Sequence, residues 1–577
     1  MEKILFSLAF CFSIFCYSQA WEQMGQKVSD PSNSSYYANI GCQAMSSNGN
    51  VIATAYTYKG NSQWHYDGSV SIYDFDGNQW QQMGTNIDFT DAFSLISLML
   101  SDDGKTLAIG YRATDDILNN GYLASGVRIY KYNGTDWILF KDFDYGGTNI
   151  LSISINSDAS VIAIANSLQG TNGMVSLYKN NGSDWISTGE LYGEQADDDF
   201  GYSIKLSSEG NTLIIGTPFN KGGGGLLSYP GAAYIYKFDG AIWKRLGQRI
   251  DGDSFQYPYF GGKVNISPDG KTVAIGIDNS MSSAGYMRIY RLNGNVWGKL
   301  GSDFTNEQSN ISDFNLSGDG NIIAVGKYAA TNLQGTAGTG ITQIYQYICS
   351  NWELTDENKI YGTAEYDRQG LKVNISNDAK TVTLGGRSGP LNFNMGINFM
   401  KVYKRDFVIP SSIQISTENQ QSTSIDVGQN LQLKTCIYPA YSYQDLVWSI
   451  SSGTDKASIN QNGIVTGLLP GIAIIRASSA KSGDIYGEIQ ITVKENMAVS
   501  ELHKQPIAIY PNPTSQIIHI SDIKNIYLLE LYAEDGKLLK YFVVAKELDL
   551  SNYSSGNYIL KITYQDGTIS DKKIIKK

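Results

Sequence analysis

The sequence predicts an all-β protein of several domains, and three observations support this prediction. Its 577 residues include 60 Gly and 39 Tyr, and few stretches have the period of an amphipathic helix. Short apolar and alternating runs, separated by turn residues, recur along the chain as they do in antiparallel sheets. The length also exceeds the roughly 250–300 residues at which one hydrophobic core stops growing, so the chain must divide into domains.

The clearest set of these runs lies between Tyr259 and Gly301. Its first run alternates apolar and polar residues, its second is almost wholly apolar, and its third alternates again. The segment SPDG, which begins at Ser267, is a tight-turn signal, and Asn293-Gly294 is a hairpin signal. Four antiparallel strands are therefore predicted, at residues 263–267, 272–276, 286–290 and 296–300.

This four-strand unit recurs seven times before residue 408. A Trp in the fourth strand recurs at Trp21, Trp80, Trp137, Trp185, Trp243, Trp297 and Trp352. A third-strand aromatic recurs at Tyr73, Tyr130, Tyr178, Tyr236, Tyr290, Tyr345 and Tyr403. The turn after the first strand begins at Ser46, Ser101, Asn156, Ser207, Ser267, Ser317 and Ser376. Four strands per unit at such a period predict a seven-bladed β-propeller over residues 21–408.

The two ends of this region complement each other. The segment Trp21–Gly25 has the pattern of a fourth strand with no strands before it, and the last unit ends after its third strand at Tyr403. We expect the N-terminal strand to complete the seventh sheet and close the ring, which removes an open sheet edge. An open array of β-units is the alternative.

The predicted connections fall into two sets that lie on opposite faces of the disc. Turns from the first to the second strand and from the third to the fourth are tight, whereas the other connections are long, and long loops on a rigid scaffold often carry function. The long connections include residues 57–67, 113–125, 217–231 and 250–259. Exposed aromatic side chains there suit sugar stacking or a protein contact, although they can also pack the loops together. The candidate ligand-binding residues are Tyr58, Trp64, His65, Tyr66, Phe255, Tyr257 and Tyr259.

Short motifs in the repeats resemble known propeller families. The segment FGYSI from Phe200, followed by Gly216-Thr217-Pro218, resembles an FG-GAP repeat, and Phe260-Gly261 matches its first half. The SPDGKT turn is similar to those of WD-type and TolB-type propellers. The DxDxxG-like loop of calcium-binding FG-GAP repeats has no full copy here, so we expect no cofactor, and calcium stays an option that no full motif supports. SPDGKT is one residue shorter than the sialidase motif SxDxGxTW, so sialidase activity is not implied.

The period changes between Pro410 and Glu495, where short strands alternate with turn residues and predict a small β-sandwich. This segment resembles the bacterial Ig-like group 2 domain, which implies such a domain at 409–495. Domains of that kind are usually spacers or adhesive modules. The segments that match are VGQNLQL, Tyr438-Pro439, VWSI, Asn462–Gly467, Pro470-Gly471 and IQITV.

Residues 507–577 form a third, hairpin-rich unit after a linker at 496–506. The unit resembles the C-terminal sorting domain of type IX secretion, with an ordinary small terminal β-sandwich as the alternative. The resemblance implies a Gram-negative cell, the type IX machinery as partner, and release or surface attachment after cleavage near the linker. The matching stretches contain Tyr510, Pro511, Asn512, Pro513, Gly536, Gly556, Lys572 and Lys573.

Residues 1–20 have the pattern of a secretory signal peptide, with Lys3, an apolar run from Ile4 to Tyr17, and small residues before the cleavage point. The run is too short for a membrane anchor, and the bulky Phe15 argues against lipidation at Cys16. No later segment is apolar enough to span a bilayer. We therefore expect a secreted or outer-surface protein, most simply a monomer. Its net charge of −11 disfavours nucleic acid and anionic membranes.

Few residues suit chemistry or cross-linking. After cleavage Cys42, Cys349 and Cys436 remain, and three widely spaced cysteines do not indicate a disulfide framework, so we expect the domains to be held by their cores. His65 is the one histidine of the propeller region, so a catalytic triad or histidine metal site would rest on it alone. The run Asp197–Asp199 could bind calcium or supply a base, although such runs are more often solvated.

These observations favour a protein without catalytic activity. We expect a secreted or cell-surface binding or adhesion protein, whose long-loop face receives an unidentified glycan or protein. The alternatives are a glycan-active propeller enzyme, with paired carboxylates across the disc, and a structural scaffold of the cell envelope.

Overall fold

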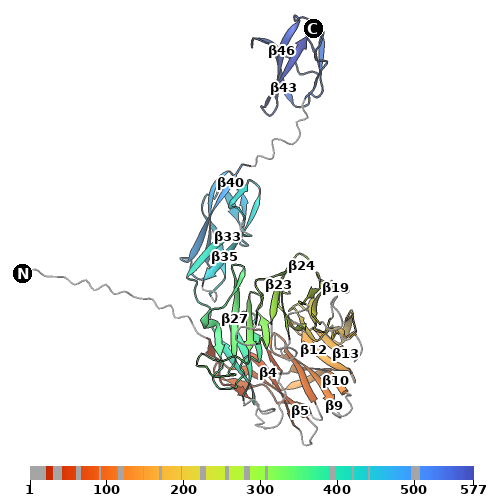
Figure 1. Ribbon diagram of the computed structural model, residues 1–577, viewed down its shortest axis with the longest axis vertical. Coiled ribbons are helices and arrows are strands. Elements are labelled where there is room, and N and C mark those ends of the chain that lie inside the picture. The colour runs from red at the N-terminus through yellow and green to blue at the C-terminus, as the bar shows by residue number, and fades with distance from the viewer. Residues whose placement is uncertain are drawn as a thin grey trace, which may run out of the picture.

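The computed structural model contains three β regions along the chain (Figure 1). It describes residues 21–29, 42–59, 66–89, 93–114, 122–146, 148–167, 172–196, 198–220, 229–253, 259–277, 286–305, 310–388, 397–418, 421–438, 442–495 and 507–577. The predicted signal peptide and the linker therefore lie outside the described residues. Within these ranges the structure is almost wholly strand and turn, with the 3-10 helix η1 (Asp356–Asn358).

The first region is of the propeller type, and its described residues form seven antiparallel sheets. The first four, in chain order, are listed by strand: β3 (Gln43–Met45), β4 (Val51–Lys59), β5 (Tyr66–Phe75), β6 (Trp80–Gln82) and β7 (Ile87–Phe89); β8 (Phe93–Leu100), β9 (Thr106–Thr114), β10 (Tyr122–Tyr132) and β11 (Trp137–Asp144); β12 (Asn149–Ile155), β13 (Val161–Ser167), β14 (Met174–Asn180) and β15 (Trp185–Tyr192); β16 (Ser203–Leu206), β17 (Thr212–Thr217), β18 (Ala232–Phe238), β19 (Trp243–Arg245) and β20 (Ile250–Asp251).

The remaining three sheets follow the same order, from an inner first strand to an outer fourth strand. They are β21 (Phe260–Ile266), β22 (Thr272–Ile277), β23 (Met287–Asn293) and β24 (Val296–Lys299); β25 (Asp313–Leu316), β26 (Ile322–Lys327), β27 (Ile341–Ile348), β28 (Asn351–Glu353) and β29 (Lys359–Tyr361); β30 (Lys372–Ile375), β31 (Thr381–Ser388) and β32 (Ile397–Lys404), joined by β1 (Glu22–Gln23) and β2 (Val28–Ser29).

The N-terminal strands pair with the sheet that ends the region. Strand β1 runs antiparallel to β32, with Glu22 opposite Lys404, and β2 pairs further along the same strand. The amide of Met24 donates to the carbonyl of Val402 at 2.8 Å. Segments almost 400 residues apart in sequence therefore share one sheet. The N-terminal strands occupy the outer edge of β32.

The inner strands of the seven sheets contact one another in a cycle. In chain order, each contacts the next, and the last contacts the first: β3, β8, β12, β16, β21, β25 and β30. The second strand of each sheet is covered on both faces, as its apolar run predicts; all six residues of β17, β22 and β26 are buried. The core is thus divided among the interfaces between neighbouring sheets.

One hydrogen-bonding pattern explains the recurring turn after the first strand. In the copy at Ser267, the serine hydroxyl donates to Asp269 at 2.5 Å and accepts the amide of Thr272 at 3.0 Å. The same acceptance from the amide five residues on occurs at Ser46, Ser101, Asn156, Ser207, Ser317 and Ser376. A short polar side chain that can accept locally is therefore required at the first position of this turn.

Adjacent turns are also joined through backbone hydrogen bonds. The amide of Ser157 donates to the carbonyl of Ser208 at 3.1 Å, and the amide of Ser208 donates to Pro268 at 2.9 Å. Pro268 has no amide hydrogen, and Asp269 donates to the next turn in its place. Further links join Gly318 to Asn377 and Asn377 to Ser47, and the hydroxyl of Ser47 donates to the carbonyl of Asp102.

The recurring tryptophans connect the outer strands of neighbouring sheets. The indole N–H of Trp297 donates to the carbonyl of Leu246, and that of Trp80 donates to Met24, both at 2.9 Å. The glycine that follows Leu246 has φ +77°, and a Cβ there would lie 2.8 Å from the Trp297 ring. The repeated pattern of Trp, two residues, Met or Leu, and Gly is therefore a contact between sheets.

The second region is a β-sandwich with the sheet orders β33-β35-β38-β37 and β34-β40-β39-β36, and Trp448 is buried in its core. In that order the strands are β33 (Ser412–Thr417), β35 (Asn430–Tyr438), β38 (Ile464–Gly467) and β37 (Ala457–Ile459), then β34 (Ser424–Asp426), β40 (Tyr486–Lys494), β39 (Gly471–Ser479) and β36 (Leu446–Ser452).

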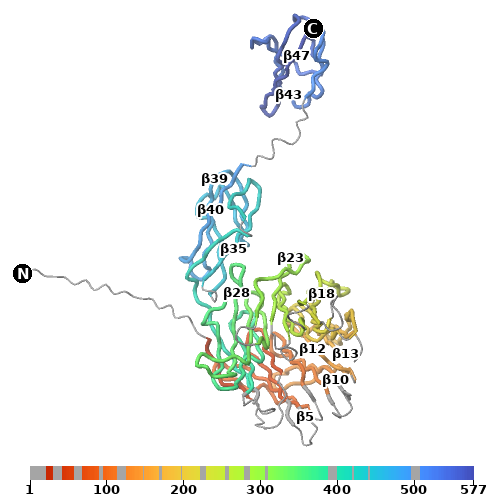
Figure 2. Tube along the Cα trace, in the orientation of Figure 1, coloured from red at the N-terminus to blue at the C-terminus, as the bar shows by residue number. Residues whose placement is uncertain are grey.

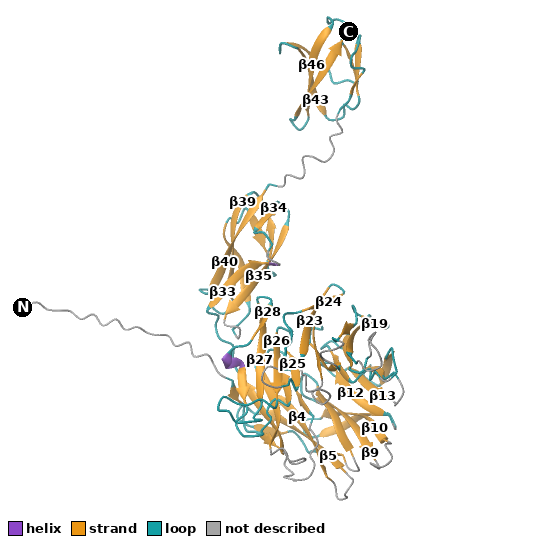
Figure 3. Cartoon of the chain, in the orientation of Figure 1, coloured by secondary structure: helices purple, strands orange, loops and turns teal. Residues whose placement is uncertain are grey.

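The expectation that the domains are held by their cores alone is wrong. Cys349 and Cys436 form a disulfide across 87 residues, with their Cα atoms 5.4 Å apart. Cys349 lies in the β27–β28 turn, where its φ is +52°, and this turn meets β35 of the sandwich (Figures 2 and 3). Phe407 and Tyr443 add an edge-to-face contact between the two regions. Sequence spacing could not reveal the pairing because only the docking of two domains brings the thiols together.

The third region is a small two-sheet unit. Its strands are β41 (Ile509–Tyr510), β42 (Ile517–Ile520) and β45 (Glu547–Asp549) in one sheet, and β44 (Leu538–Phe542), β43 (Ile526–Ala533), β46 (Gly556–Tyr564) and β47 (Ile569–Lys576) in the other. Asn512 links both ends of the unit, because its side chain donates to the carbonyl of Lys573 at 2.6 Å and accepts the amide of Ile575 at 2.8 Å.

Candidate functional site

The predicted ligand-binding residues are only partly within the described structure. Trp64, His65, Phe255 and Tyr257 lie outside the described residues. Tyr58 and Tyr66 are not in an irregular loop, because β4 continues to Lys59 and β5 begins at Tyr66. The connection predicted at 113–125 is also shorter, because β10 begins at Tyr122 and pairs with β9 from there.

Tyr259 is the one predicted aromatic whose side chain can be placed. It is half-buried, and its ring lies 5.4 Å from that of Phe219 and 6.3 Å from that of Tyr229. Its amide donates to the carbonyl of Tyr229 at 2.9 Å. Tyr259 therefore packs one long connection against another, which is the alternative role that the sequence left open for these residues.

A cavity of about 510 Å³, here called the axial cavity, lies among the inner strands of the propeller-type region and was not predicted. All seven inner strands line it, mostly with residues from their N-terminal ends. The inner strands begin after the long connections and end at the tight turns, so this cavity lies on the long-connection side. A smaller cavity of about 100 Å³ lies at the tight-turn end, where the linked turns narrow the axis.

The wall of the large cavity is built by side chains that satisfy free backbone amides. On four inner strands, a polar side chain of the preceding inner strand accepts a backbone amide. Ser154 accepts the amide of Leu206 at 2.9 Å, and Asp313 accepts that of Val373 at 3.0 Å. Similar bonds run from Val264 to Ser203 and from Leu316 to Asn265. Polar residues on an otherwise apolar inner strand were the signal available in the sequence.

Charged side chains interrupt this polar wall. Lys263 pairs with the buried carboxylate of Asp313 at 2.7 Å. Burial alone would raise the pKa of Asp313, but the charges of Lys263 and Lys372 outweigh it and hold that pKa below its usual value. Arg112 donates to the side chain of Asn149 at 2.7 Å. Asp313 is therefore ionised at neutral pH and cannot serve as a general base with a raised pKa.

Lys205 has a different environment. Its ammonium lies 3.7 Å from the thioether sulfur of Met99, which is a weak acceptor. The pKa of Lys205 is lowered to about 8, mainly by burial and also by the charge of Lys263, while Asp102 opposes both. Among the described carboxylates, none forms an ion pair with this ammonium.

Cys42, the free cysteine of the described chain, lies in the same wall. Its thiol donates to the carbonyl of Leu95 at 3.4 Å. Burial raises the pKa of the thiol to about 11, although Lys372 and Lys263 act against it. The thiol is therefore protonated at neutral pH and is a poor nucleophile.

The acidic run 197–199 has no metal-binding geometry in its described part. Asp198 is buried rather than solvated, and it accepts the amide of Phe200 at 3.1 Å. Burial raises the pKa of Asp198 to about 6, against the effect of that hydrogen bond. Asp197 lies outside the described residues. Across the described ranges, no cluster of three or more His, Cys, Asp or Glu side chains is arranged to hold a metal ion.

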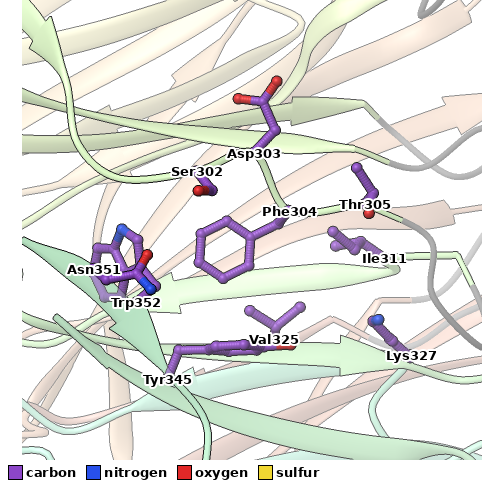
Figure 4. A pocket seen from close by; sticks show the side chains of 10 residues that line it. All are labelled: Ser302, Asp303, Phe304, Thr305, Ile311, Val325, Lys327, Tyr345, Asn351 and Trp352. Carbon is purple, nitrogen blue, oxygen red and sulfur yellow. The ribbon is translucent and has the colours of Figure 1, made fainter.

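A second pocket, of about 170 Å³, lies between the sheets that contain β23 and β27. Figure 4 shows the ring of Phe304 in the middle of this pocket, close to Tyr345. The two ring centroids are 4.9 Å apart, and Asp303 beside them pairs with Lys299 and Arg288. Phe304 fills the space between the sheets, so this pocket is a packing gap and the axial cavity is the better candidate site.

Two segments match known families. Residues 508–577 match the secretion system C-terminal sorting domain, and residues 412–489 match the bacterial Ig-like domain of group 2. A search of curated proteins found no match. None of the helices in the described ranges is long and apolar enough to cross a lipid bilayer.

Solved structures that match this chain at low sequence identity include propellers. Sqt1 from Chaetomium thermophilum is 16% identical, with a TM-score of 0.40 over 65% of this chain and 86% of Sqt1. The β-propeller domain of the Trilobed protease from Pyrococcus furiosus is 11% identical, with a TM-score of 0.38 over 63% of this chain and 95% of that domain.

The family matches and the sheets together define the domain organisation of the chain. It carries a propeller-type region, a bacterial Ig-like domain, and a sorting domain of the type IX secretion system.

Proposed function

We propose that the first region is a closed seven-bladed propeller and that the exported protein is a binding protein without catalytic activity, whose ligand enters at the long-connection face. The axial cavity of about 510 Å³ is the observation that supports this function most. Its volume falls within the range of roughly 300–1,000 Å³ that ligand pockets occupy. The cycle of contacts among inner strands and the pairing of β1 with β32 support closure.

The position of the Ig-like domain supports the same face. Cys349 lies in a turn between a third and a fourth strand, and such turns lie opposite the long connections. The disulfide therefore fastens the Ig-like domain to the tight-turn side, away from the large cavity. A sorting domain at the other end of the chain would deliver this open face to the outer surface, after removal of the N-terminal signal peptide.

The described cavity residues favour binding over catalysis. The carboxylate of Asp313 is paired, the thiol of Cys42 is protonated, and the described cavity wall contains no histidine. We therefore infer that the protein holds its ligand without changing it and needs no cofactor. Adhesion to a glycan or to a protein on a neighbouring surface is the use that fits an exported chain with an Ig-like spacer.

Glycan-array and surface-protein capture experiments with the purified full chain test this function. Binding should weaken when Trp64, Tyr66 and Tyr257 are replaced by Ala together. Replacing the exposed sorting-domain residues Tyr527 and Tyr541 by Ala is the matched control and should leave binding unchanged. Absence of any glycan or protein ligand, or turnover of a polysaccharide, would contradict the proposal.

A further inference from the structure

The axial cavity has a charge that is opposite to that of the whole protein. The chain has a net charge of −11, but the cations that line the cavity outnumber the carboxylates. The cations are Arg112, Lys205, Lys263 and Lys372, and the carboxylates are Asp199 and Asp313. A cavity with walls of low dielectric concentrates the field of such charges and attracts an anion.

The arrangement of these charges follows the repeat. Lys263, Asp313 and Lys372 each stand four residues before the turn that ends the inner strand, in three successive sheets. Asp313 thus lies between two lysines and lowers the positive charge of the pair without cancelling it. Both lysines line the cavity, and the charges of both act on the carboxylate of Asp313.

Lys205 is the third lysine that lines the cavity, and it is the least compensated. Its strand, β16, contacts β21, which carries Lys263. Its ammonium is held against a thioether instead of a carboxylate, and the approach of Lys263 adds repulsion. Keeping a desolvated cation in this position costs stability, which is the pattern expected when the charge serves a ligand.

The rest of the wall suits hydroxyl groups. Serine hydroxyls and asparagine amides face the cavity between the lysines, including Ser97, Ser152, Ser203, Asn265, Asn315 and Asn374. The hydroxyl of Ser203 accepts a backbone amide and still has its proton to donate. Mixed donors and acceptors around a cationic centre match a polyhydroxylated ligand that carries a carboxylate or sulfate group.

We propose that the axial cavity binds an acidic saccharide, with Lys205, Lys263 and Lys372 as the cations that receive its carboxylate or sulfate group. The inference rests on the proposed binding function and names the chemical class of its ligand. A bound anion would replace the missing partner of Lys205 and offset the repulsion between Lys205 and Lys263.

Calorimetric titration of the purified full chain tests the ligand class. The probes are trigalacturonate, its fully methyl-esterified form and a sulfated disaccharide. The free acid or the sulfated sugar should bind at least about tenfold more tightly than the neutral ester of similar size. Equal affinity for acid and ester, or no binding of either acidic probe, would overturn the proposal. Inorganic sulfate that binds as tightly as the saccharides would also overturn it.

Variants test the residues. Lys205→Met should weaken binding of the acidic saccharide about tenfold, whereas Lys205→Arg should retain most of it. Lys244→Met is the matched control, because its side chain is 63% exposed at the outer edge of a sheet and should not affect binding. Undiminished binding by Lys205→Met would refute the assignment. Neutral glycans that bind without preference for acids would refute this inference alone, and failure of all ligands would refute the proposed function.

Discussion

Replacing Lys205 by methionine is expected to make the protein more stable. The pKa of Lys205 is lowered from 10.5 to about 8, and each unit corresponds to roughly 1.4 kcal/mol between the charged and neutral forms. The charged form is therefore disfavoured by roughly 3 kcal/mol at neutral pH. Methionine has a similar volume and removes this cost, but some favourable interaction with Asp102 is lost. We expect a net gain of about 1–2 kcal/mol in the free energy of unfolding.

The pH dependence provides an internal check on this prediction. Between pH 8 and 10.5 the unfolded wild-type chain binds the Lys205 proton while the folded chain has released it, so wild-type stability rises in this window. The gain in the free energy of unfolding from Lys205→Met should therefore be largest below pH 8 and should shrink toward pH 10.5. Urea unfolding followed by tryptophan fluorescence reports on the propeller, since only Trp448 of the nine tryptophans lies outside that region.

The control for this experiment is Lys244→Met, which removes an exposed lysine and should change stability by less than about 0.5 kcal/mol. A loss of stability in Lys205→Met at pH 7 would refute the reasoning. A constant difference between variant and wild type from pH 7 to pH 10 would refute it equally.

Three further predictions concern the repeats, the cysteines and the ligand. Gly261→Ala should destabilise the propeller by at least about 3 kcal/mol, because the φ of Gly261 is +91° and the new Cβ would lie 2.2 Å from a backbone oxygen. Gly240 has a φ of +101° but open space around it, so Gly240→Ala should cost only about 1–2 kcal/mol in the same urea titration. Peptide mapping without reduction should recover Cys349 and Cys436 in one cross-linked species, and two separate peptides would contradict the domain contact. The affinity for an acidic saccharide should fall as pH rises from 7 to 9, because Lys205 loses its proton near pH 8; a flat profile would show that its charge does not contribute.

Other charged groups in and near the cavity also affect how binding depends on pH. Lys263 and Asp102 act directly on Lys205, and Asp313 is ionised throughout this range. The thiol of Cys42, with a pKa of about 11, stays protonated below pH 9. Repeating the titration with Lys205→Met separates Lys205 from the remaining groups, since only the part of the pH dependence that disappears in the variant belongs to it.

Local patterns in the sequence predicted most of the strands and turns. The turn at Ser267 recurs because one hydroxyl can bond both a neighbouring carboxylate and an amide five residues on, and this requirement is visible in any single copy. The regular spacing of the tryptophans likewise predicted the outer strands. The ends of the long connections were wrong near Tyr58 and Tyr66, because sheet hydrogen bonding continues past the point where the apolar pattern stops.

The candidate site was much harder to predict from the sequence than the strands and turns. Lys205, Lys263 and Lys372 stand in three separate repeats, and each is preceded and followed by ordinary strand residues. Lys263 and Lys372 share a position four residues before the turn, and Lys205 stands two residues before it, but a lysine at such a position in one strand is commonly a solvated side chain. Only the meeting of seven inner strands turns these positions into one wall.

By itself the sequence determined the all-β class, the seven repeats, and the identity of the Ig-like and sorting segments, because each depends on residues that are close together in the chain. The tertiary structure decided which lysines share the axial cavity, which loop aromatics pack against one another, and that Cys349 meets Cys436. These are contacts between residues far apart in sequence, and they exist only because the inner strands line one cavity and a second domain packs against the sheets.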